Sequence, residues 1–401
     1  MGNVSNSYKK SELLQTKKSV QVPQTIQKRD NLSQVKRIVV KVGSSTISDD
    51  LRINEAALDG LVHDLATVRH NGYEVILVTS GAIAAGWPHL GLSTRPQTLP
   101  ALQASAAVGQ IRLMAAYEER FRHYGQCPAL MLLTQDDFSH RTRYTRINDT
   151  LHTLLQLGAI PIINENDSVS VEEIKVGDND TLSAYVTNLA QADLLIILSD
   201  QHGFFTEDPR LNPDSELIYT VDDITEDMWQ AAGQAGTKGT GGMLTKLHAA
   251  EIVTSSGEMV AIAYGREPLV ITRILKGELL GTLFLPNSRI SGRKRWIAYS
   301  RPPQGTLVVD NGAHLALLQG GKSLLPAGVK GVEGHFNYSD TVSCVTENRV
   351  EFARGLTNYN STDASKLVGK QTQDIGNILG YHDYDEIIHR DNLVLLNYSK
   401  T

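Results

Sequence analysis

Two lysines stand beside small residues in patterns that could hold an anion. Lys41 interrupts the apolar run R-I-V-V-K-V, and Gly43 with three hydroxyl-bearing residues follows it. Lys246 lies in the first turns of a helical pattern that follows the glycine-rich run T-K-G-T-G-G. A cation is disfavoured near a helix N-terminus unless an anion binds there, so the segment of Lys246 favours phosphate binding over a flexible glycine loop. Lys41, taken by itself, is better explained as an edge-strand lysine that reaches solvent, and a phosphate ligand beside exposed backbone N–H groups is the alternative.

A second kind of anion site is indicated by the run V-I-L-V-T-S-G-A-I-A-A-G. Its apolar part is typical of a buried strand, which ends at Ser80 and Gly81 before a helical start. The first N–H groups of a helix are unpaired and its dipole favours negative charge. Ser80 could equally be an ordinary N-cap, and the segment alone leaves both interpretations open.

Polar residues are concentrated in a third region, which follows the apolar run A-I-P-I-I. Asn164 and Asp167 come directly after that run, and Asp178, Asn179 and Asp180 open the next helical pattern. Carboxylates pair with ammonium groups and amides bind carboxylates, so this density suits recognition of a zwitterion. Acidic residues are also ordinary caps at helix starts, and Asp178 by itself is better explained as structural.

Motifs of other nucleotide-binding and metal-binding folds are absent from the sequence. The run Gly321, Lys322, Ser323 resembles the end of a P-loop, but Ala316 occupies the position of the required first glycine. No G-x-G-x-x-G follows the first predicted strand, which weakens a dehydrogenase interpretation. The 12 histidines show no H-E-x-x-H spacing and the two cysteines form no C-x-x-C pair. We therefore expect no metal site built by protein side chains.

The elements that must position these residues alternate between strand patterns and helical patterns. Helical spacing of one buried face joins Leu182, Tyr185, Val186 and Leu189, and small residues around Gly109 predict a helix that packs closely. Six apolar runs of strand length occupy residues 35–42, 73–79, 128–134, 159–163, 193–199 and 259–263. This alternation predicts an α/β domain with an open, mostly parallel sheet sandwiched by helices. Ligands of such sheets gather at the carboxyl ends of the strands.

Changes in composition divide the chain into four parts. Residues 1–34 are polar and modestly basic and lack the apolar core of a signal peptide, which predicts a disordered tail. The α/β domain covers 35–286, and a basic linker covers 287–296. Short glycine-punctuated segments at 297–401 predict a small β-rich domain. All the segments with chemical character precede residue 250, so we expect the second domain to be dispensable for the chemistry itself.

Composition limits the class of protein. With 41% hydrophobic and 20% charged residues over 401 positions, the chain is typical of a globular protein. The net charge of -6 argues against a mainly electrostatic nucleic-acid binder. No apolar run approaches the roughly 18 residues of a membrane helix. We expect a cytoplasmic protein that does not enter a membrane.

Six runs, in this order, closely resemble the glutamate 5-kinases of the amino acid kinase superfamily. They are V-V-K-V-G-S-S, V-T-S-G-A-I-A-A-G, I-N-E-N-D-S-V, I-K-V-G-D-N-D-T-L-S-A, L-S-D-Q-H-G-F-F-T-E-D-P-R and G-T-G-G-M-L-T-K. The later runs R-K-R-W, S-L-L-P-A-G-V, G-L-T-N-Y-N-S and I-L-G-Y resemble the C-terminal PUA domain of that family. Ser168 and Leu244 are mild departures from its motifs. The resemblance implies the amino acid kinase fold followed by a PUA-like domain.

The resemblance also implies an activity and a set of site residues. The expected reaction is ATP-dependent phosphorylation of the γ-carboxylate of L-glutamate, the first step of proline biosynthesis, with Mg²⁺ arriving on the nucleotide. By resemblance, Lys41 and Lys246 hold the transferring phosphoryl group and Asp180 orients both lysines. The substrate residues it implies are Ser80, Gly81, Asp167 and Asn179, and the nucleotide residues are Lys41, Gly43, Ser199, Asp200, Gly241, Gly242, Met243 and Lys246.

Elementary chemistry is compatible with these roles. A phosphoryl group in flight spreads negative charge over its oxygens, so catalysis is largely positioning and electrostatic stabilisation. The acceptor carboxylate is ionised at neutral pH, and no strong general base is required. The family likeness further implies self-association and feedback inhibition by proline.

Two alternatives stay open at the level of sequence. One is another amino-acid or carbamate kinase of the same superfamily, acting for example on acetylglutamate or aspartate. The other is an RNA-binding protein, because PUA domains commonly serve RNA enzymes; RNA binding by this domain is unproven, and the acidic balance counts against it. The I-N-E-N-D and G-D-N-D runs, together with the PUA-like tail, favour free glutamate.

Overall fold

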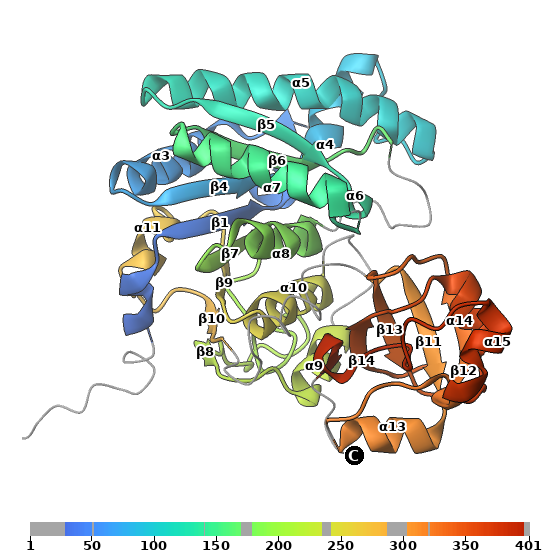
Figure 1. Cartoon of the computed structure of the whole chain (residues 1–401). Coiled ribbons are helices and arrows are strands. Elements are labelled where there is room, and N and C mark those ends of the chain that lie inside the picture. Colours follow the sequence, from blue (N-terminus) through green and yellow to red (C-terminus); the bar gives the residue numbers. More distant parts are fainter. Residues whose placement is uncertain are drawn as a thin grey trace, which may run out of the picture.

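The computed structural model describes residues 29–49, 52–139, 141–169, 179–234, 242–286, 303–319 and 321–396. Within these ranges the chain forms a large α/β domain and a smaller β-rich domain (Figure 1). The fold class expected from the sequence is confirmed. The predicted linker at 287–296 lies outside the described residues. Among those described, no helix combines the length and hydropathy needed to cross a membrane.

The large domain is organised by an eight-stranded sheet. Its first six strands run parallel to one another, and each coincides with one of the predicted apolar runs. In sheet order the strands are β5 (Pro128–Leu133), β6 (Ile160–Glu165), β4 (Glu74–Val78), β1 (Arg37–Val42), β7 (Leu194–Ser199), β9 (Met259–Tyr264), β10 (Thr282–Phe284) and β8 (Thr220–Val221). The antiparallel β10 and its neighbour β8 escaped prediction because they are too short to show a period.

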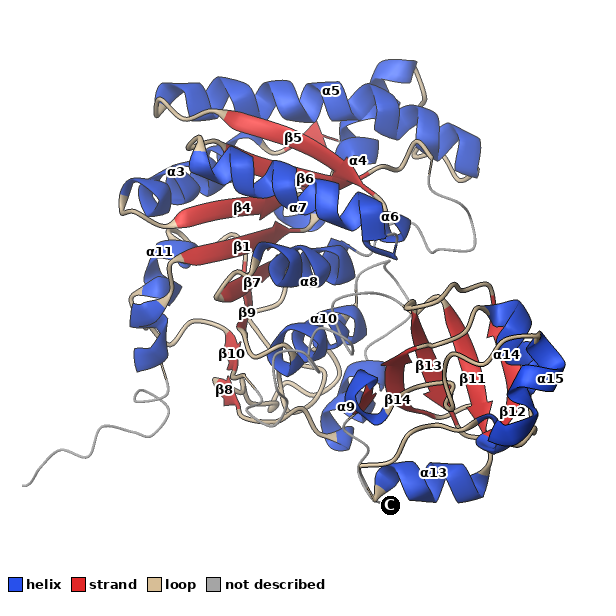
Figure 2. Cartoon of the chain, in the orientation of Figure 1, coloured by secondary structure: helices blue, strands red, loops and turns tan. Residues whose placement is uncertain are grey.

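Helices cover both faces of this sheet (Figure 2). Strand side chains therefore point alternately into two cores, with Val39 in one and Val40 in the other. Burial on both faces explains why the strands read as continuous apolar runs. One face carries α3 (Glu55–His70), α5 (Leu99–His123) and α11 (Val270–Leu275); the other carries α7 (Arg141–Gln156), α8 (Asn179–Ala190) and α10 (Met243–Ser255). The predicted amphipathic helix is α8.

Two glycines let helix α4 (Ala82–Gly86) cross the long helix α5 at very short range. A Cβ on Gly86 would lie 1.8 Å from the carbonyl oxygen of Ser105, and a Cβ on Gly109 would lie 1.7 Å from that of Ala82. No other residue type allows two backbones to approach this closely. The close packing predicted around Gly109 is thus confirmed, and it ties the turn before α4 to α5.

The folded large domain begins within the segment that was predicted to be a disordered tail. Asp30–Gln34 forms the short helix η1, whose Leu32 is 1% exposed. The Arg29 guanidinium donates hydrogen bonds to the carbonyl oxygens of Tyr219 at 3.0 Å and Gly281 at 3.1 Å. The prediction of a tail through residue 34 is therefore wrong for 29–34, because one buried leucine and one shared guanidinium anchor this segment. Residues 1–28 lie outside the described ranges.

Short elements complete the large domain between the principal strands and helices. A small hairpin follows β1, and a single turn of 3-10 helix precedes α5. Their bounds are α2 (Ser44–Ile47), β2 (Ser48–Asp49), β3 (Arg52–Ile53), η2 (Trp87–Leu90), α6 (Gln135–Ser139) and α9 (Glu226–Gln234).

The second domain has its own five-stranded sheet and its own core around Leu307, Phe352 and Ile388. This confirms the β-rich domain expected after the linker. The strands in sheet order are β12 (Val329–Gly334), β11 (Gly305–Val309), β13 (Thr341–Val345), β14 (Glu351–Leu356) and β15 (Leu393–Leu395). The helices are α13 (Asn311–Leu318), η3 (Pro326–Gly328), α14 (Ser361–Leu367), η4 (Thr372–Asp374), α15 (Ile375–Leu379) and η5 (Arg390–Asn392).

An apolar contact joins the two domains. Leu356 of β14 and Val394 of β15 are buried in the same continuous core cluster as Leu247 of α10. Trp229 of α9 and Leu396 are partly buried against that cluster. Figure 1 shows α9 lying next to β14. The helix that carries Lys246 is therefore packed in a core to which the second domain contributes.

Candidate active site

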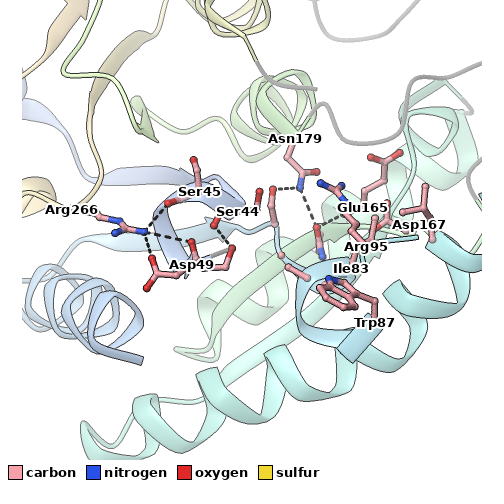
Figure 3. Close-up of a pocket in the computed structure, with 17 residues that line it drawn as sticks. Ser44, Ser45, Asp49, Ile83, Trp87, Arg95, Glu165, Asp167, Asn179 and Arg266 are labelled. Carbon is pink, nitrogen blue, oxygen red and sulfur yellow. Dashed lines mark hydrogen bonds and ion pairs between the residues drawn. The ribbon is translucent and has the colours of Figure 1, made fainter. Parts of the chain in front are cut away.

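A cavity of about 750 Å³ opens at the carboxyl edge of the large sheet. Its walls come from the segments after β1, β4, β6 and β9 and from the start of α8 (Figure 3). This is the edge where parallel sheets bind ligands, because several loops and helix N-termini converge there. The lining residues are Ser44, Ser45, Ser48, Asp49, Ser80, Gly81, Ala82, Ile83, Ala84, Trp87, Arg95, Leu102, Asn164, Glu165, Asp167, Asn179 and Arg266.

Both lysines singled out in the sequence meet on one carboxylate. Lys41 Nζ lies 2.6 Å from Asp180 Oδ1, and Lys246 Nζ lies 3.1 Å from Asp180 Oδ2. Thr245 Oγ1 also donates to Asp180 Oδ2, at 2.7 Å. The two lysines and the aspartate are each at most 6% exposed. An edge-strand lysine is therefore excluded for Lys41, because β1 lies inside the sheet with partners on both sides.

The electrostatics of this buried cluster favour an anion. Burial by itself raises the pKa of Asp180, but the ammonium groups of Lys41 and Lys246 outweigh it and hold that pKa far below the usual range. The carboxylate consequently stays ionised. Two ammonium groups against one carboxylate leave a net positive charge in a buried position, where an approaching phosphoryl group would be strongly attracted.

Glycine-bearing turns flank the lysines. Gly43 caps α2, and a Cβ built on it would lie 3.6 Å from Lys41 Nζ, so the backbone here passes close to the ammonium group. Gly242 is the N-cap of α10 and Met243 is its first residue. Lys246 thus projects from the first turn of a helix, where unpaired N–H groups bind anions. Gly241 lies outside the described residues, as does Asp178.

Ser199 and Asp200 end strand β7 at the same edge of the sheet. The Ser199 hydroxyl donates to Asp200 Oδ1 at 3.1 Å and accepts from the backbone N–H of Gln201 at 3.3 Å. Ser199 is buried and Asp200 is exposed. The two residues do not line the cavity described above, although they end a strand at the same edge of the sheet.

The side chain of Asn179 forms hydrogen bonds to the turn that follows β4. Its Nδ2 donates to Ser80 Oγ at 2.7 Å and to the carbonyl oxygen of Thr79 at 2.8 Å. Gly81 adopts a φ of +105°, a conformation that favours glycine at this sharp turn. Asn179 Oδ1 is buried and has no hydrogen-bond partner among the residues that the structure describes. A ligand N–H would satisfy it, since buried acceptors are rarely left unpaired.

Asp167 lines the cavity beside Glu165, on the side that Figure 3 shows away from Arg266. Burial, and secondly the neighbouring Glu165, raise the pKa of Asp167 to about 6. No positively charged group in the described part of the chain lowers this pKa. An ammonium group bound beside Asp167 would supply a cationic partner for this carboxyl group.

A chain of amides behind the pocket was not foreseen from the sequence. Asn164 accepts a hydrogen bond from Asn179 Nδ2 at 3.2 Å and donates from its own Nδ2 to Gln110 Oε1 at 2.8 Å. Gln110 comes from α5 and is 8% exposed. A buried glutamine directly after Gly109, on the closely packed stretch of a helix, was the signal that could have revealed it.

Arg266 and Arg95 also line the cavity and were also missed. Arg266 Nη2 donates to the Ser45 carbonyl oxygen at 3.1 Å and to Asp49 Oδ1 at 2.8 Å, and so braces the turn after β1. Neither arginine stands in a recognisable motif, and only the tertiary fold brings them to the site. In the portion of the chain that is described, no group of three or more His, Cys, Asp or Glu side chains is arranged to hold a metal ion.

Comparison with known proteins agrees with this geometry. The model of the amino acid kinase family matches residues 36–263, and that of the PUA domain matches residues 305–379. A glutamate 5-kinase of Caldanaerobacter subterraneus subsp. tengcongensis is 50% identical over 90% of this chain and 98% of its own length. One of Geobacter sp. (strain M21) is 49% identical over 92% of this chain and 100% of its own length. The chain therefore belongs to the amino acid kinase family and, within it, to the glutamate 5-kinases.

Proposed function

We propose that the protein transfers the γ-phosphoryl group of ATP to the γ-carboxylate of L-glutamate, giving L-glutamyl 5-phosphate, the first step of proline biosynthesis. The observation that carries this proposal is the juxtaposition of a buried two-lysine cluster with a cavity that holds an uncompensated carboxyl group, Asp167. One part suits a phosphoryl group and the other suits an amino acid. Relatives about 50% identical carry the name of this activity.

Lys41 and Lys246 are the proposed catalytic cations. They hold the oxygens of the phosphoryl group as its charge spreads during transfer, while Asp180 is a positioning residue that keeps both ammonium groups in place. Because Asp180 holds both ammonium groups in place, little reorganisation is needed during the reaction. The acceptor carboxylate is already a nucleophile at neutral pH, so the site needs no general base.

The amino acid is proposed to bind in the cavity. Asp167 receives the α-ammonium group, and Asn179 Oδ1 accepts a second N–H from it. Ser80 and the backbone of Gly81 form the opposite wall, at the start of α4. Glutamate bound in this way directs its side chain toward β1 and the lysine cluster.

The nucleotide is proposed to lie along the glycine-bearing turns. Gly43, Gly241, Gly242 and Met243 offer backbone N–H groups to the phosphates, together with Lys41 and Lys246, and Ser199 with Asp200 contacts the remainder of ATP. Magnesium arrives with ATP and neutralises phosphate charge. The supporting observation is that Gly43, Gly242, Ser199 and the lysines share one edge of the sheet.

A substrate panel tests the proposal. The protein is incubated with magnesium ATP and hydroxylamine, which traps acyl phosphates as hydroxamates, and with glutamate, N-acetylglutamate, aspartate or carbamate in turn. Glutamate should give the highest kcat/KM. Preference for N-acetylglutamate would contradict the assignment of Asp167 to an ammonium group, because acetylation removes that charge.

We also infer that the protein acts in the cytoplasm as a homo-oligomer that proline inhibits, as the family resemblance implies. Self-association is supported by the edge strand β5, which exposes Leu130 and Leu132 by 44% and 36%. Light scattering and inhibition by added proline measure the two properties directly.

A further inference from the structure

Free glutamate presents three charges to the cavity, and the pocket residues discussed so far match two of them. The γ-carboxylate must face Lys41 and Lys246, and the α-ammonium group pairs with Asp167. The α-carboxylate still needs a cation or strong donors, because a carboxylate taken out of water without a partner is costly. The question is which positive side chain at the cavity is available to it.

Most cations at the site are already engaged. Lys41 and Lys246 share Asp180. Arg266 is paired with Asp49 at 2.8 Å, and Figure 3 shows it at the end of the cavity opposite Glu165 and Asp167. Its charge is therefore compensated, and its position is wrong for a group attached to the same carbon as the ammonium.

Arg95 is differently placed. It lies on the segment between η2 and α5, lines the cavity, and is drawn on the Glu165 and Asp167 side in Figure 3. Among the described residues it forms no ion pair or hydrogen bond, although Glu165 and Asp167 line the same cavity. Its side chain is exposed at the mouth, so an entering amino acid reaches it directly.

We propose that the Arg95 guanidinium binds the α-carboxylate of the amino-acid substrate and thereby determines specificity. This inference depends on the proposed function, since it assumes that an amino acid fills the cavity. Asp167 and Arg95 then recognise the two charged substituents of one α-carbon, and the γ-carboxylate is left to point toward the lysines. The planar guanidinium can donate two parallel hydrogen bonds to a carboxylate, which lysine cannot match.

The magnitude follows from the exposure of Arg95. Hydrogen bonds to charged groups are among the stronger ones, but Arg95 is exposed, so water and salt screen its interaction and the effect is moderate. Arg95→Gln should therefore raise KM for glutamate about tenfold, equivalent to about 1.4 kcal/mol. The KM for ATP and kcat should stay within twofold, because the guanidinium is proposed to contact the α-carboxylate and not the transferring phosphoryl group. The KM of Arg95→Lys for glutamate should lie between those of the wild type and Arg95→Gln.

Arg112→Gln is a matched control, because Arg112 is an exposed arginine on α5 that does not line the cavity. It should leave every kinetic constant unchanged. Hydroxamate formation measures the constants, and a melting curve of each variant checks that it is folded. An unchanged KM for glutamate in folded Arg95→Gln would overturn the proposal.

Two analogues separate recognition of the carboxylate from a general effect on the pocket. Glutarate lacks the α-ammonium group, and 4-aminobutyrate lacks the α-carboxylate. As inhibitors of glutamate phosphorylation, glutarate should lose about tenfold in affinity on Arg95→Gln, and 4-aminobutyrate should be unaffected. Equal losses would mean that Arg95 shapes the pocket without binding the carboxylate. If neither analogue inhibits the wild type, the KM comparison decides. Wild-type protein that fails to phosphorylate glutamate would refute the proposed function itself, whatever Arg95 does.

Discussion

The two halves of the active site differ in how completely their polar groups are paired before a ligand binds. In the phosphoryl half, Asp180 already contacts both lysines and the Thr245 hydroxyl. In the amino-acid half, Asn179 Oδ1 has no partner within the described structure, and the pKa of Asp167 is raised to about 6. In the proposed mechanism, the lysine cluster is already paired, whereas the pocket around Asp167 obtains its remaining partners from the amino acid.

This difference assigns different tasks to the two halves. A preorganised cluster stabilises the transition state because it needs no rearrangement when charge develops. An incompletely paired pocket confers affinity and specificity, because the correct ligand relieves unfavourable burial that other ligands leave in place. Substitutions in the first half should therefore change kcat, and those in the second should change KM for glutamate.

The largest effect is expected from removing one lysine. Lys41→Met or Lys246→Met should lower kcat by about 10²-fold or more, the usual loss for one preorganised donor. Steady-state hydroxamate assays at saturating ATP and glutamate measure it. Normal turnover by a folded Lys246→Met protein would remove that residue from the site.

The same substitution tests whether the cluster also stabilises the fold. Removing one partner of a buried ion pair can destabilise by about 3–5 kcal/mol, and here the second lysine and Thr245 should reduce that loss. Adding Asp180→Asn to Lys41→Met should lower the melting temperature further, because it leaves the buried Lys246 ammonium group without a carboxylate. A melting curve of each variant measures the loss, and a double variant that melts above Lys41→Met would contradict the stabilising role of the pair.

The next largest effect is expected from a substitution of Asp167 in the proposed amino-acid pocket. Asp167→Asn should raise KM for glutamate at least tenfold and leave KM for ATP nearly unchanged, because it removes the charge opposite the substrate ammonium. If ATP affinity suffers instead, the pocket assignment is wrong.

Asp167→Asn should also change stability. The folded-state pKa of Asp167 lies above its unfolded value, so the ionised carboxylate opposes folding above pH 6. The variant should therefore melt at a higher temperature than the wild type at pH 7.5.

A smaller effect of the same origin is expected with pH. Asp167 must be ionised to bind an ammonium group, so kcat/KM for glutamate should fall as pH drops through about 6, the pKa in the free protein. Glutamate's own side-chain carboxyl titrates lower, near 4.3. Burial, and secondly the neighbouring Glu165, place the pKa of Asp167 in this range. In Asp167→Asn this dependence should disappear, and a wild-type profile that is flat from pH 7.5 to 5.5 would contradict the assignment.

The smallest effect on catalysis is expected from removing the second domain. A chain ending at Pro286 retains every proposed site residue and should still phosphorylate glutamate. It loses Leu356, Val394 and Leu396 from the shared core cluster and exposes Trp229, so it should melt earlier and aggregate more readily. A melting curve, light scattering and the hydroxamate assay measure these properties. A well-folded but inactive fragment would show that the second domain completes the active site.

Most of the large domain could be predicted because parallel strands buried on both faces leave uninterrupted apolar runs. All six predicted runs became strands, and the spacing around Leu182 became α8. The two missed strands of the eight-stranded sheet have three and two residues, too few to show any period. The segment at 29–34 was misassigned because its anchoring depends on carbonyl groups from positions about 190 to 250 residues away.

The sequence by itself determined which chemical groups are available: two lysines beside glycine turns, a dense run of carboxylates and amides, and a strand pattern that sends them to one edge of a sheet. Only the tertiary structure decided their pairing. It joined Lys41 and Lys246 through Asp180, gave Asp167 no cationic partner among the described residues, and brought Arg95 to the same cavity. Local spacing reports on neighbours within a turn or a strand, whereas the charge balance of a site depends on groups that meet only when distant segments pack.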